Sequence, residues 1–222
     1  MILAILFYGI AFVFLIWTCY KKGREKLTIF AKTVTSFGFL LISLVGYFIS
    51  RDVRYFWIVF PGLLFCFAGD ILLAIRYQKI EQKWLVFGIL SFLMAHIYFI
   101  FRLQEIMPIH LFEVAISIAA MGMVYGIFKL PFMKPGAVKW LCVFYSFFVT
   151  MLLIKGVQAG AYFAYRPRGI VLLIGAIFFW TSDFTLIFQY FSEKEIKSLR
   201  FWNLLMYYIG VAGIASSIQF LN

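Results

Sequence analysis

Single aspartates interrupt two otherwise apolar stretches of the chain: PGLLFCFAGDILLAI at residues 61–75 and LLIGAIFFWTSDFTLIF at residues 172–188. Asp70 lies in the first stretch and Asp183 in the second. Each stretch is long enough to form most of a bilayer-spanning helix. A carboxyl group at membrane depth is energetically costly unless it is paired, protonated or hydrated. The two residues therefore indicate function as well as a membrane environment.

The composition extends this interpretation to the whole chain. Hydrophobic residues make up 65% of the 222 residues, 29 residues are Phe, and the mean hydropathy is +1.00. A soluble domain of this length does not need so much apolar surface, so we expect an all-α integral membrane protein. The opening segment, MILAILFYGIAFVFLIWTCY, has neither a basic leading region nor a small-residue cleavage site. We therefore predict that it is the first transmembrane helix and not a signal peptide.

Charged residues and Pro- or Gly-containing breaks divide the chain into eight candidate membrane-spanning helices. Each has roughly the ~20 residues that a hydrocarbon core of ~30 Å requires. We predict a polytopic eight-helix bundle that forms a single transmembrane domain over residues 1–222. A small-Asp-x-x-Leu pattern at residues 69–73 recurs at 182–186, which suggests a parallel 4+4 helix duplication. The predicted spans are about 2–20, 28–49, 55–75, 84–102, 109–128, 139–157, 169–191 and 201–221.

The basic residues indicate the orientation. Of 20 Lys and Arg residues, 13 lie in the first, third, fifth and seventh connections and five in the others, with Lys32 and Lys155 inside spans. Because cytoplasmic loops carry the excess of Lys and Arg, we predict that the odd connections are cytoplasmic and both termini outside. The net charge of +11 then reflects topology and lipid headgroup contact, not nucleic acid binding. The short loops favour a bacterial inner membrane over an organelle membrane. The 13 residues are Lys21, Lys22, Arg24, Lys26, Arg76, Lys79, Lys83, Lys129, Lys134, Lys139, Lys194, Lys197 and Arg200.

On this topology, several polar side chains share the cytoplasmic half of the membrane. A rise of 1.5 Å per residue puts Asp70 about 9 Å and Asp183 about 12 Å from the cytoplasmic ends of their helices. We predict that this layer is the floor of a cavity in which the two carboxyl groups converge. The candidate functional residues are Asp70, Asp183, His96, Lys32, Ser36, Arg76, Ser182, Asn203 and Tyr207.

Each of these residues also has a purely structural interpretation. An intramembrane aspartate can serve as a hydrogen-bond partner between helices, Lys32 can extend to the membrane interface, and His96 can bond a buried carbonyl. Two aspartates at matched depth favour function, because each would be costly alone. For Lys155 and Glu113, near the predicted outer boundary, we expect extension to the interface or mutual pairing.

Three blocks of the sequence resemble the YhhN family of lysoplasmalogenase-like membrane proteins. They are GDILLAI at 69–75, FGILSFLMAHIYFIF at 87–101 and GAIFFWTSDFTLIFQYF at 175–191. Tyr207-Tyr208 is similar to the family's closing tyrosine block, and the AKT around Lys32 resembles its early T-K-P-L element, with Thr33-Val34 in place of Pro-Leu. The resemblance implies hydrolysis of the vinyl ether bond of lysoplasmalogens, giving a fatty aldehyde and glycerophosphoethanolamine or glycerophosphocholine. It also implies that the two intramembrane aspartates are catalytic.

This chemistry suits the residues. Vinyl ether hydrolysis needs a proton on the alkenyl carbon and then a water, much as glycoside hydrolysis uses a protonated and an ionised carboxyl group. We predict an acid/base pair of Asp70 and Asp183, with His96 as the third catalytic residue and with neither a metal nor another cofactor. Lys32 and Arg76 are predicted to hold the headgroup phosphate. The other predicted substrate-binding residues are Ser36, Ser182, Asn203 and Tyr207. The predicted partners are a lysophospholipid substrate and membrane lipids. Which aspartate is the acid, which headgroup is preferred and the oligomeric state stay open.

The alternative is a proton-coupled transporter or carrier of a lipid or other amphiphile. Intramembrane carboxyl groups accompanied by His and Lys also suit proton coupling. Spans with few internal Gly or Pro breaks argue mildly against a transporter built from broken helices.

Overall fold

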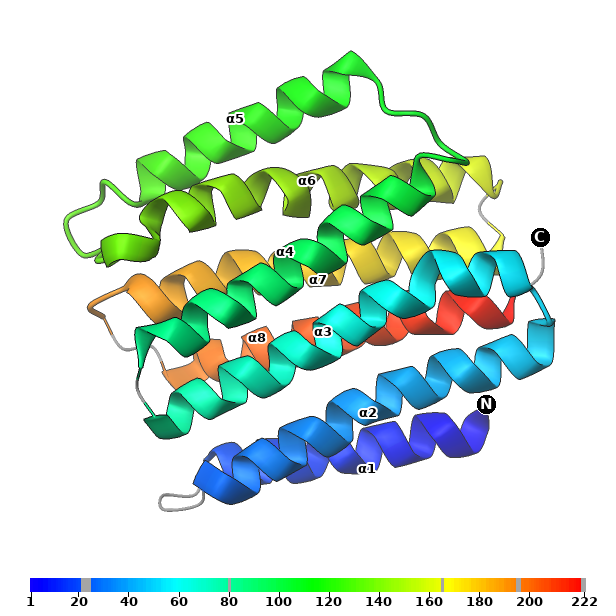
Figure 1. Ribbon diagram of the computed structural model, residues 1–222, viewed down its shortest axis with the longest axis horizontal. Helices are drawn as coiled ribbons and strands as arrows, with labels where there is room; N and C mark the ends of the chain where they lie inside the picture. Colours follow the sequence, from blue (N-terminus) through cyan, green and yellow to red (C-terminus); the bar gives the residue numbers. More distant parts are fainter. Residues whose placement is uncertain (21–24, 80, 165, 195–196, 221–222) are drawn as a thin grey trace. The chain divides into compact units, whose positions relative to one another are not determined.

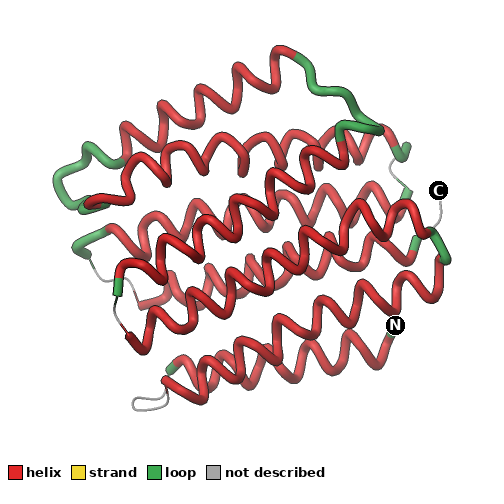
Figure 2. Tube along the Cα trace, viewed as in Figure 1, coloured by secondary structure: helices red, strands yellow, loops and turns green. Residues whose placement is uncertain are grey.

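The computed structural model describes residues 1–20, 25–79, 81–164, 166–194 and 197–220, and these residues form α-helices joined by short loops (Figures 1 and 2). Within these ranges the chain has eight α-helices and two 3₁₀ helices. They are α1 (Ile2–Cys19), α2 (Glu25–Ser50), α3 (Val53–Lys79), α4 (Gln82–Leu103), α5 (Leu111–Ile127), η1 (Gly136–Val138), α6 (Lys139–Tyr162), α7 (Pro167–Phe191), α8 (Lys197–Ser216) and η2 (Ser217–Gln219).

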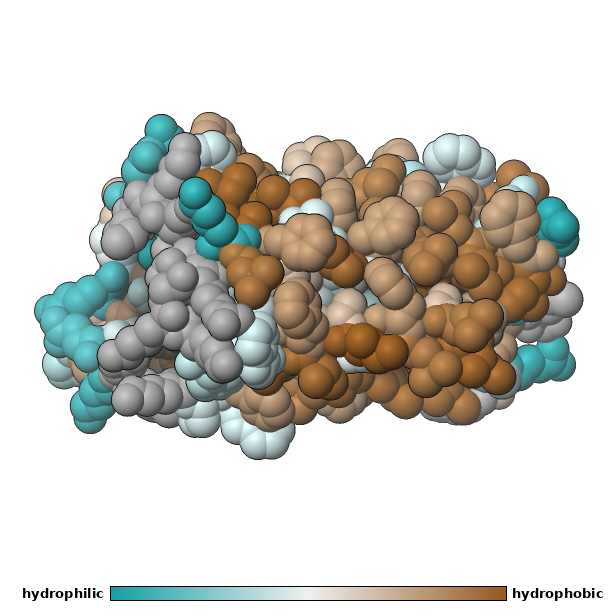
Figure 3. Space-filling view, turned by 90° about the horizontal axis from the view of Figure 1, so that it is seen from below, coloured by the Kyte–Doolittle hydropathy of each residue, from teal (hydrophilic) through white to brown (hydrophobic). Residues whose placement is uncertain are grey.

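The eight predicted spans coincide with the eight α-helices, and seven of these are long and apolar enough to cross a membrane. The eighth, α5, has 17 residues and is the shortest. Apolar side chains dominate the visible face in Figure 3. Exposed apolar side chains also occur on α5, where Leu111 is 84% exposed. A helix satisfies its own backbone hydrogen bonds, which is what a lipid environment demands. The prediction of an all-α, multi-pass membrane protein is confirmed.

The boundaries differ from the predicted ones mainly where polar residues extend a helix beyond its apolar run. Thus α2 begins at Glu25, α3 continues to Lys79 and α6 to Tyr162. The last helix ends early, at Ser216, and passes into η2. The predicted end of the final span at Leu221 and the loop residues Lys21, Lys22 and Arg24 lie outside the described residues. The orientation of the termini and the 4+4 duplication stay predictions.

Backbone contacts group the chain into two compact units. Unit 1 contains Met1–Tyr98 and the chain from Ala215 onward, and unit 2 contains Phe99–Ile214. The division falls inside α4 and near the end of α8, so each of these helices contributes to both units. The prediction that the whole chain is one transmembrane domain stays a prediction.

In unit 1, a tyrosine of α4 compensates for a proline inside α3. Pro61 has no amide hydrogen, so it cannot make the helical bond to the carbonyl of Trp57, four residues earlier. The hydroxyl of Tyr98 donates to that carbonyl, with 2.5 Å between the oxygens. The same two helices meet closely further along, where a Cβ on Gly69 would lie 2.7 Å from the ring of Phe92. The proline is therefore accommodated by a neighbouring helix.

In unit 2, small residues let three helices approach closely. A Cβ on Gly175 of α7 would lie 2.9 Å from the carbonyl oxygen of Gly210 on α8, and Gly156 of α6 lies directly against Ala176 of α7. Close backbone approach of this kind is a main source of helix association in membranes. It fixes the register of α7 against both of its neighbours in this unit.

A buried ion pair joins α6 to the start of α5. Lys155 Nζ lies 2.9 Å from Glu113 Oε2, and both side chains are 0% exposed. Lys155 also donates to the carbonyls of Met107 and Pro108, at 2.8 and 3.0 Å, while Gln158 donates to Glu113 Oε1 at 2.8 Å. Of the two roles expected for Lys155 and Glu113, the structure shows pairing. These polar groups bind one another, so we interpret the cluster as a structural link between α6 and the start of α5.

The proline compensation makes a prediction about stability. Tyr98→Phe should lower the free energy of unfolding by about 1–2 kcal/mol, because the Trp57 carbonyl loses a donor in apolar surroundings. In a chain that also carries Pro61→Ala, the same change should have much less effect, because the alanine amide can bond that carbonyl. Unfolding in detergent micelles measures both differences. An equal loss in both backgrounds would show that Tyr98 stabilises the protein in another way.

Candidate functional site

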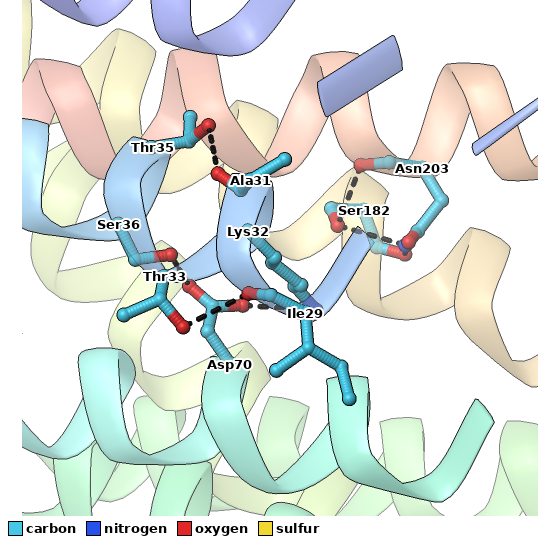
Figure 4. A network of polar contacts seen from close by, with 9 residues as sticks. All are labelled: Ile29, Ala31, Lys32, Thr33, Thr35, Ser36, Asp70, Ser182 and Asn203. Atoms are coloured by element: carbon cyan, nitrogen blue, oxygen red, sulfur yellow. Dashed lines mark hydrogen bonds and ion pairs between the residues drawn. The ribbon is translucent and has the colours of Figure 1, made fainter. Parts of the chain in front are cut away.

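Asp70 lies inside unit 1 on α3, where two side chains of α2 bind it (Figure 4). Lys32 Nζ lies 3.1 Å from Oδ1, and the hydroxyl of Ser36 donates to Oδ2 at 2.6 Å. Asp70 is 1% exposed and Lys32 8%. Each carboxylate oxygen thus faces a donor, which is the arrangement that suits the ionised form. The structure brings together three of the predicted site residues.

The sequence of α2 explains this arrangement. Lys32 and Ser36 are four residues apart, so they lie one above the other on the same face of the helix. Thr35 points elsewhere: its hydroxyl bonds the carbonyl of Ala31 at 2.8 Å and that of Ala11 on α1 at 3.0 Å. The ring of Tyr8 from α1 fills the space beside Gly38. Contact with α1 on one side therefore holds the Lys32 face toward α3.

His96 is fully buried on α4, and its tautomer follows from its contact. Nδ1 lies 2.7 Å from the carbonyl oxygen of Phe92, which can only accept a hydrogen bond. Nδ1 therefore carries the hydrogen, and in the neutral ring Nε2 is the basic nitrogen. The contact is the carbonyl bond that the structural interpretation expected. The ring of Phe92 packs on Gly69, next to Asp70, which ties this segment of α4 to α3.

Asp183 lies on α7 in unit 2 and is partly exposed. Its Oδ2 accepts a hydrogen bond from the hydroxyl of Tyr145 on α6, with 2.9 Å between the oxygens. Tyr145 is not among the predicted site residues. The two residues are 38 positions apart and belong to no common motif, so only the packing of α6 on α7 reveals the pair.

Three of the predicted substrate-binding residues join α7 to α8 within unit 2. Asn203 Nδ2 donates to the carbonyl and to the hydroxyl oxygen of Ser182, at 2.8 and 3.0 Å, and Ser182 Oγ donates to the Asn203 carbonyl at 3.2 Å (Figure 4). One turn further, the ring of Tyr207 packs edge-on against Phe179, with centroids 5.5 Å apart. These contacts secure the helix segment that carries Asp183. A role of the three residues in substrate binding stays a prediction.

Arg76 is the last of the predicted site residues. It lies six residues beyond Asp70 on α3, about 9 Å along the helix axis, and is partly exposed. Its predicted contact with a phosphate and the predicted convergence of the two aspartates both stay predictions. Among the described residues, no three His, Cys, Asp or Glu side chains form a group that could hold a metal ion.

Comparison with known proteins identifies one family. The family model of the YhhN family matches residues 27–218, which is most of the chain and includes both aspartates and every predicted site residue. No curated protein and no solved structure matches the chain.

The Lys32–Asp70 pair makes a prediction about stability. Lys32→Met should lower the free energy of unfolding by about 3 kcal/mol, because a buried carboxylate loses its counter-charge. Adding Asp70→Asn to the Lys32→Met chain should recover part of that loss, because the uncompensated charge is then absent. Thermal unfolding of the purified protein in detergent measures both effects. Lys26→Gln, an exposed lysine on the same helix, is the control and should leave stability unchanged. No recovery in the double variant would contradict the pairing.

Proposed function

This chain belongs to the YhhN family, and from that membership we propose that it is an intramembrane hydrolase of lysoplasmalogens. The reaction cleaves the vinyl ether bond of an alkenyl lysophospholipid with water. The products are a fatty aldehyde and glycerophosphoethanolamine or glycerophosphocholine.

The observation that carries this proposal is the buried carboxylate of Asp70. Protonation of a vinyl ether produces an oxocarbenium-like cation, and a fixed negative charge in surroundings from which water is excluded stabilises such a cation strongly. Lys32 allows the charge of Asp70 to exist in an apolar helix layer, and Ser36 restricts the orientation of the carboxylate. These contacts support the assignment of Asp70 as the ionised member of the acid/base pair.

Hydrolysis also needs a group that gives a proton and accepts one back. The proton goes to the alkenyl carbon distal to the ether oxygen, and water then adds to the carbon that carries this oxygen. The added water loses a proton to give a hemiacetal. The hemiacetal then loses its hydroxyl proton to form the aldehyde while the C–O bond to the ether oxygen breaks and that oxygen takes up a proton, so atoms and charge balance. Asp183 is our candidate for this group. His96, with its basic Nε2 in the neutral form, is the candidate for relaying protons.

The headgroup phosphate needs a cation, and the sequence offers Lys32 and Arg76. Lys32 lies against Asp70, and we assign the phosphate to Arg76, whose guanidinium can bind two oxygens at once. The alkenyl chain would lie along the apolar helix faces. This division of roles makes Lys32 a partner of the catalytic carboxylate.

The two aspartates provide the direct test. Asp70→Asn and Asp183→Asn should each reduce aldehyde release by about a hundredfold or more, because each removes a carboxyl group that acts on the reacting atoms. The assay uses purified protein in detergent with an alkenyl lysophosphoethanolamine and with the choline analogue. Activity in detergent, where no gradient exists, also separates hydrolysis from transport.

Two controls accompany this assay. Asp52→Asn changes an aspartate at the start of α3, where its side chain accepts a hydrogen bond from the Tyr55 amide, and it should leave the rate unchanged. A lysophospholipid with a saturated ether in place of the vinyl ether should not be cleaved, because it cannot be protonated to an oxocarbenium ion. Normal rates in both aspartate variants, or no aldehyde from the wild-type protein, would refute the proposal.

A further inference from the structure

Asp183 has a close neighbour on a helix to which the proposed function gives no role. Tyr145, on α6, donates its phenol hydrogen to Asp183 Oδ2 across 2.9 Å. None of the residues predicted for the site lies on α6, and the blocks that resemble the YhhN family do not include it. The contact therefore adds a residue that sequence motifs do not reveal.

The packing of α6 against α7 determines this contact. Four pairs of residues meet along the two helices, and their order is opposite in the two sequences, as antiparallel neighbours require. In order along α7 they are Gly169 with Ala159, Ala176 with Gly156, Trp180 with Thr150, and Asp183 with Tyr145. The bond thus belongs to a series of contacts that follows the two helices in antiparallel order.

The packing in this series is tight. A Cβ on Gly169 would lie 2.8 Å from the Ala159 carbonyl oxygen, and Gly156 leaves room for Ala176. Nearer to Asp183, the indole nitrogen of Trp180 donates to the Thr150 hydroxyl at 3.3 Å. Small residues and this hydrogen bond hold the two backbones in one register, which places the Tyr145 hydroxyl beside the carboxyl group of Asp183.

We propose that Tyr145 is the positioning residue of Asp183. Its hydroxyl holds Oδ2 and fixes the plane of the carboxyl group that gives up and takes back a proton. A phenol donates equally to an ionised carboxylate and to the carbonyl oxygen of a carboxyl group protonated on its other oxygen. The bond can therefore persist through the proton transfer. This inference rests on the proposed function, in which Asp183 acts on the vinyl ether.

The experiment compares Tyr145→Phe, Asp183→Asn and the double variant in the full-length protein in detergent. Phenylalanine keeps the ring and removes only the donor. Tyr145→Phe should lower kcat for aldehyde release by about tenfold with KM within about twofold, because substrate still binds while the carboxyl group is less well oriented. In the Asp183→Asn background the same change should have no further effect, because no carboxyl group remains to be oriented. If Asp183→Asn leaves no measurable turnover, Asp183→Glu serves as the background, and the loss should again be well below tenfold.

Controls separate positioning from a general loss of structure. Tyr162→Phe removes a hydroxyl from the same helix at a residue that is 58% exposed, and it should leave kcat unchanged. All variants should elute as the wild type does in size-exclusion chromatography. A wild-type kcat in Tyr145→Phe, or an equal loss in both backgrounds, would overturn the role of Tyr145 while the proposed function stands. A wild-type protein that releases no aldehyde would instead contradict the proposed function and this role together.

Discussion

Inside a bilayer, a polar group has to find its partner within the protein, because the lipid offers none. This constraint accounts for several polar contacts between helices in the described part of the chain. It pairs the carbonyl that Pro61 leaves without an amide with the hydroxyl of Tyr98. It also pairs the ammonium group of Lys32 with the carboxylate of Asp70. In each pair the partner comes from a neighbouring helix, so the contacts that satisfy polar groups also join the helices.

The same constraint separates structural from candidate functional polar residues. In the cluster of Lys155 and Glu113, the ammonium group faces a carboxylate and two backbone carbonyls, and the carboxylate also accepts from Gln158. Such a closed network ties helix ends together and leaves little for a substrate to bind. Asp183 differs because the residue is partly exposed and the Tyr145 hydroxyl holds one of its oxygens. A carboxyl group held in a defined orientation suits proton transfer.

Small residues hold neighbouring helices in a defined register. The sequence blocks that resemble the YhhN family contain Gly69 and Gly175, and both lie where another helix approaches closely. Gly69 admits the ring of Phe92, whose carbonyl orients His96, one turn away. Gly175 brings α7 against α8 near the bonds between Ser182 and Asn203. Two glycines of the motif blocks thus help to hold the helices that carry the aspartates.

Several features follow from the sequence alone: the fold class, the eight helices and the prediction that Lys32, Ser36 and Asp70 share one layer of the bundle. These features are local: an apolar run either matches the bilayer thickness or does not, and depth follows from counting residues along a helix. The packing of the helices was needed to show that Lys32 pairs with Asp70, that Tyr98 donates to the carbonyl that Pro61 leaves without an amide and that Tyr145 donates to Asp183. Such pairs depend on how each helix is rotated and in which register it packs. Rotation and register emerge from many small contacts along both helices, and no short motif encodes them.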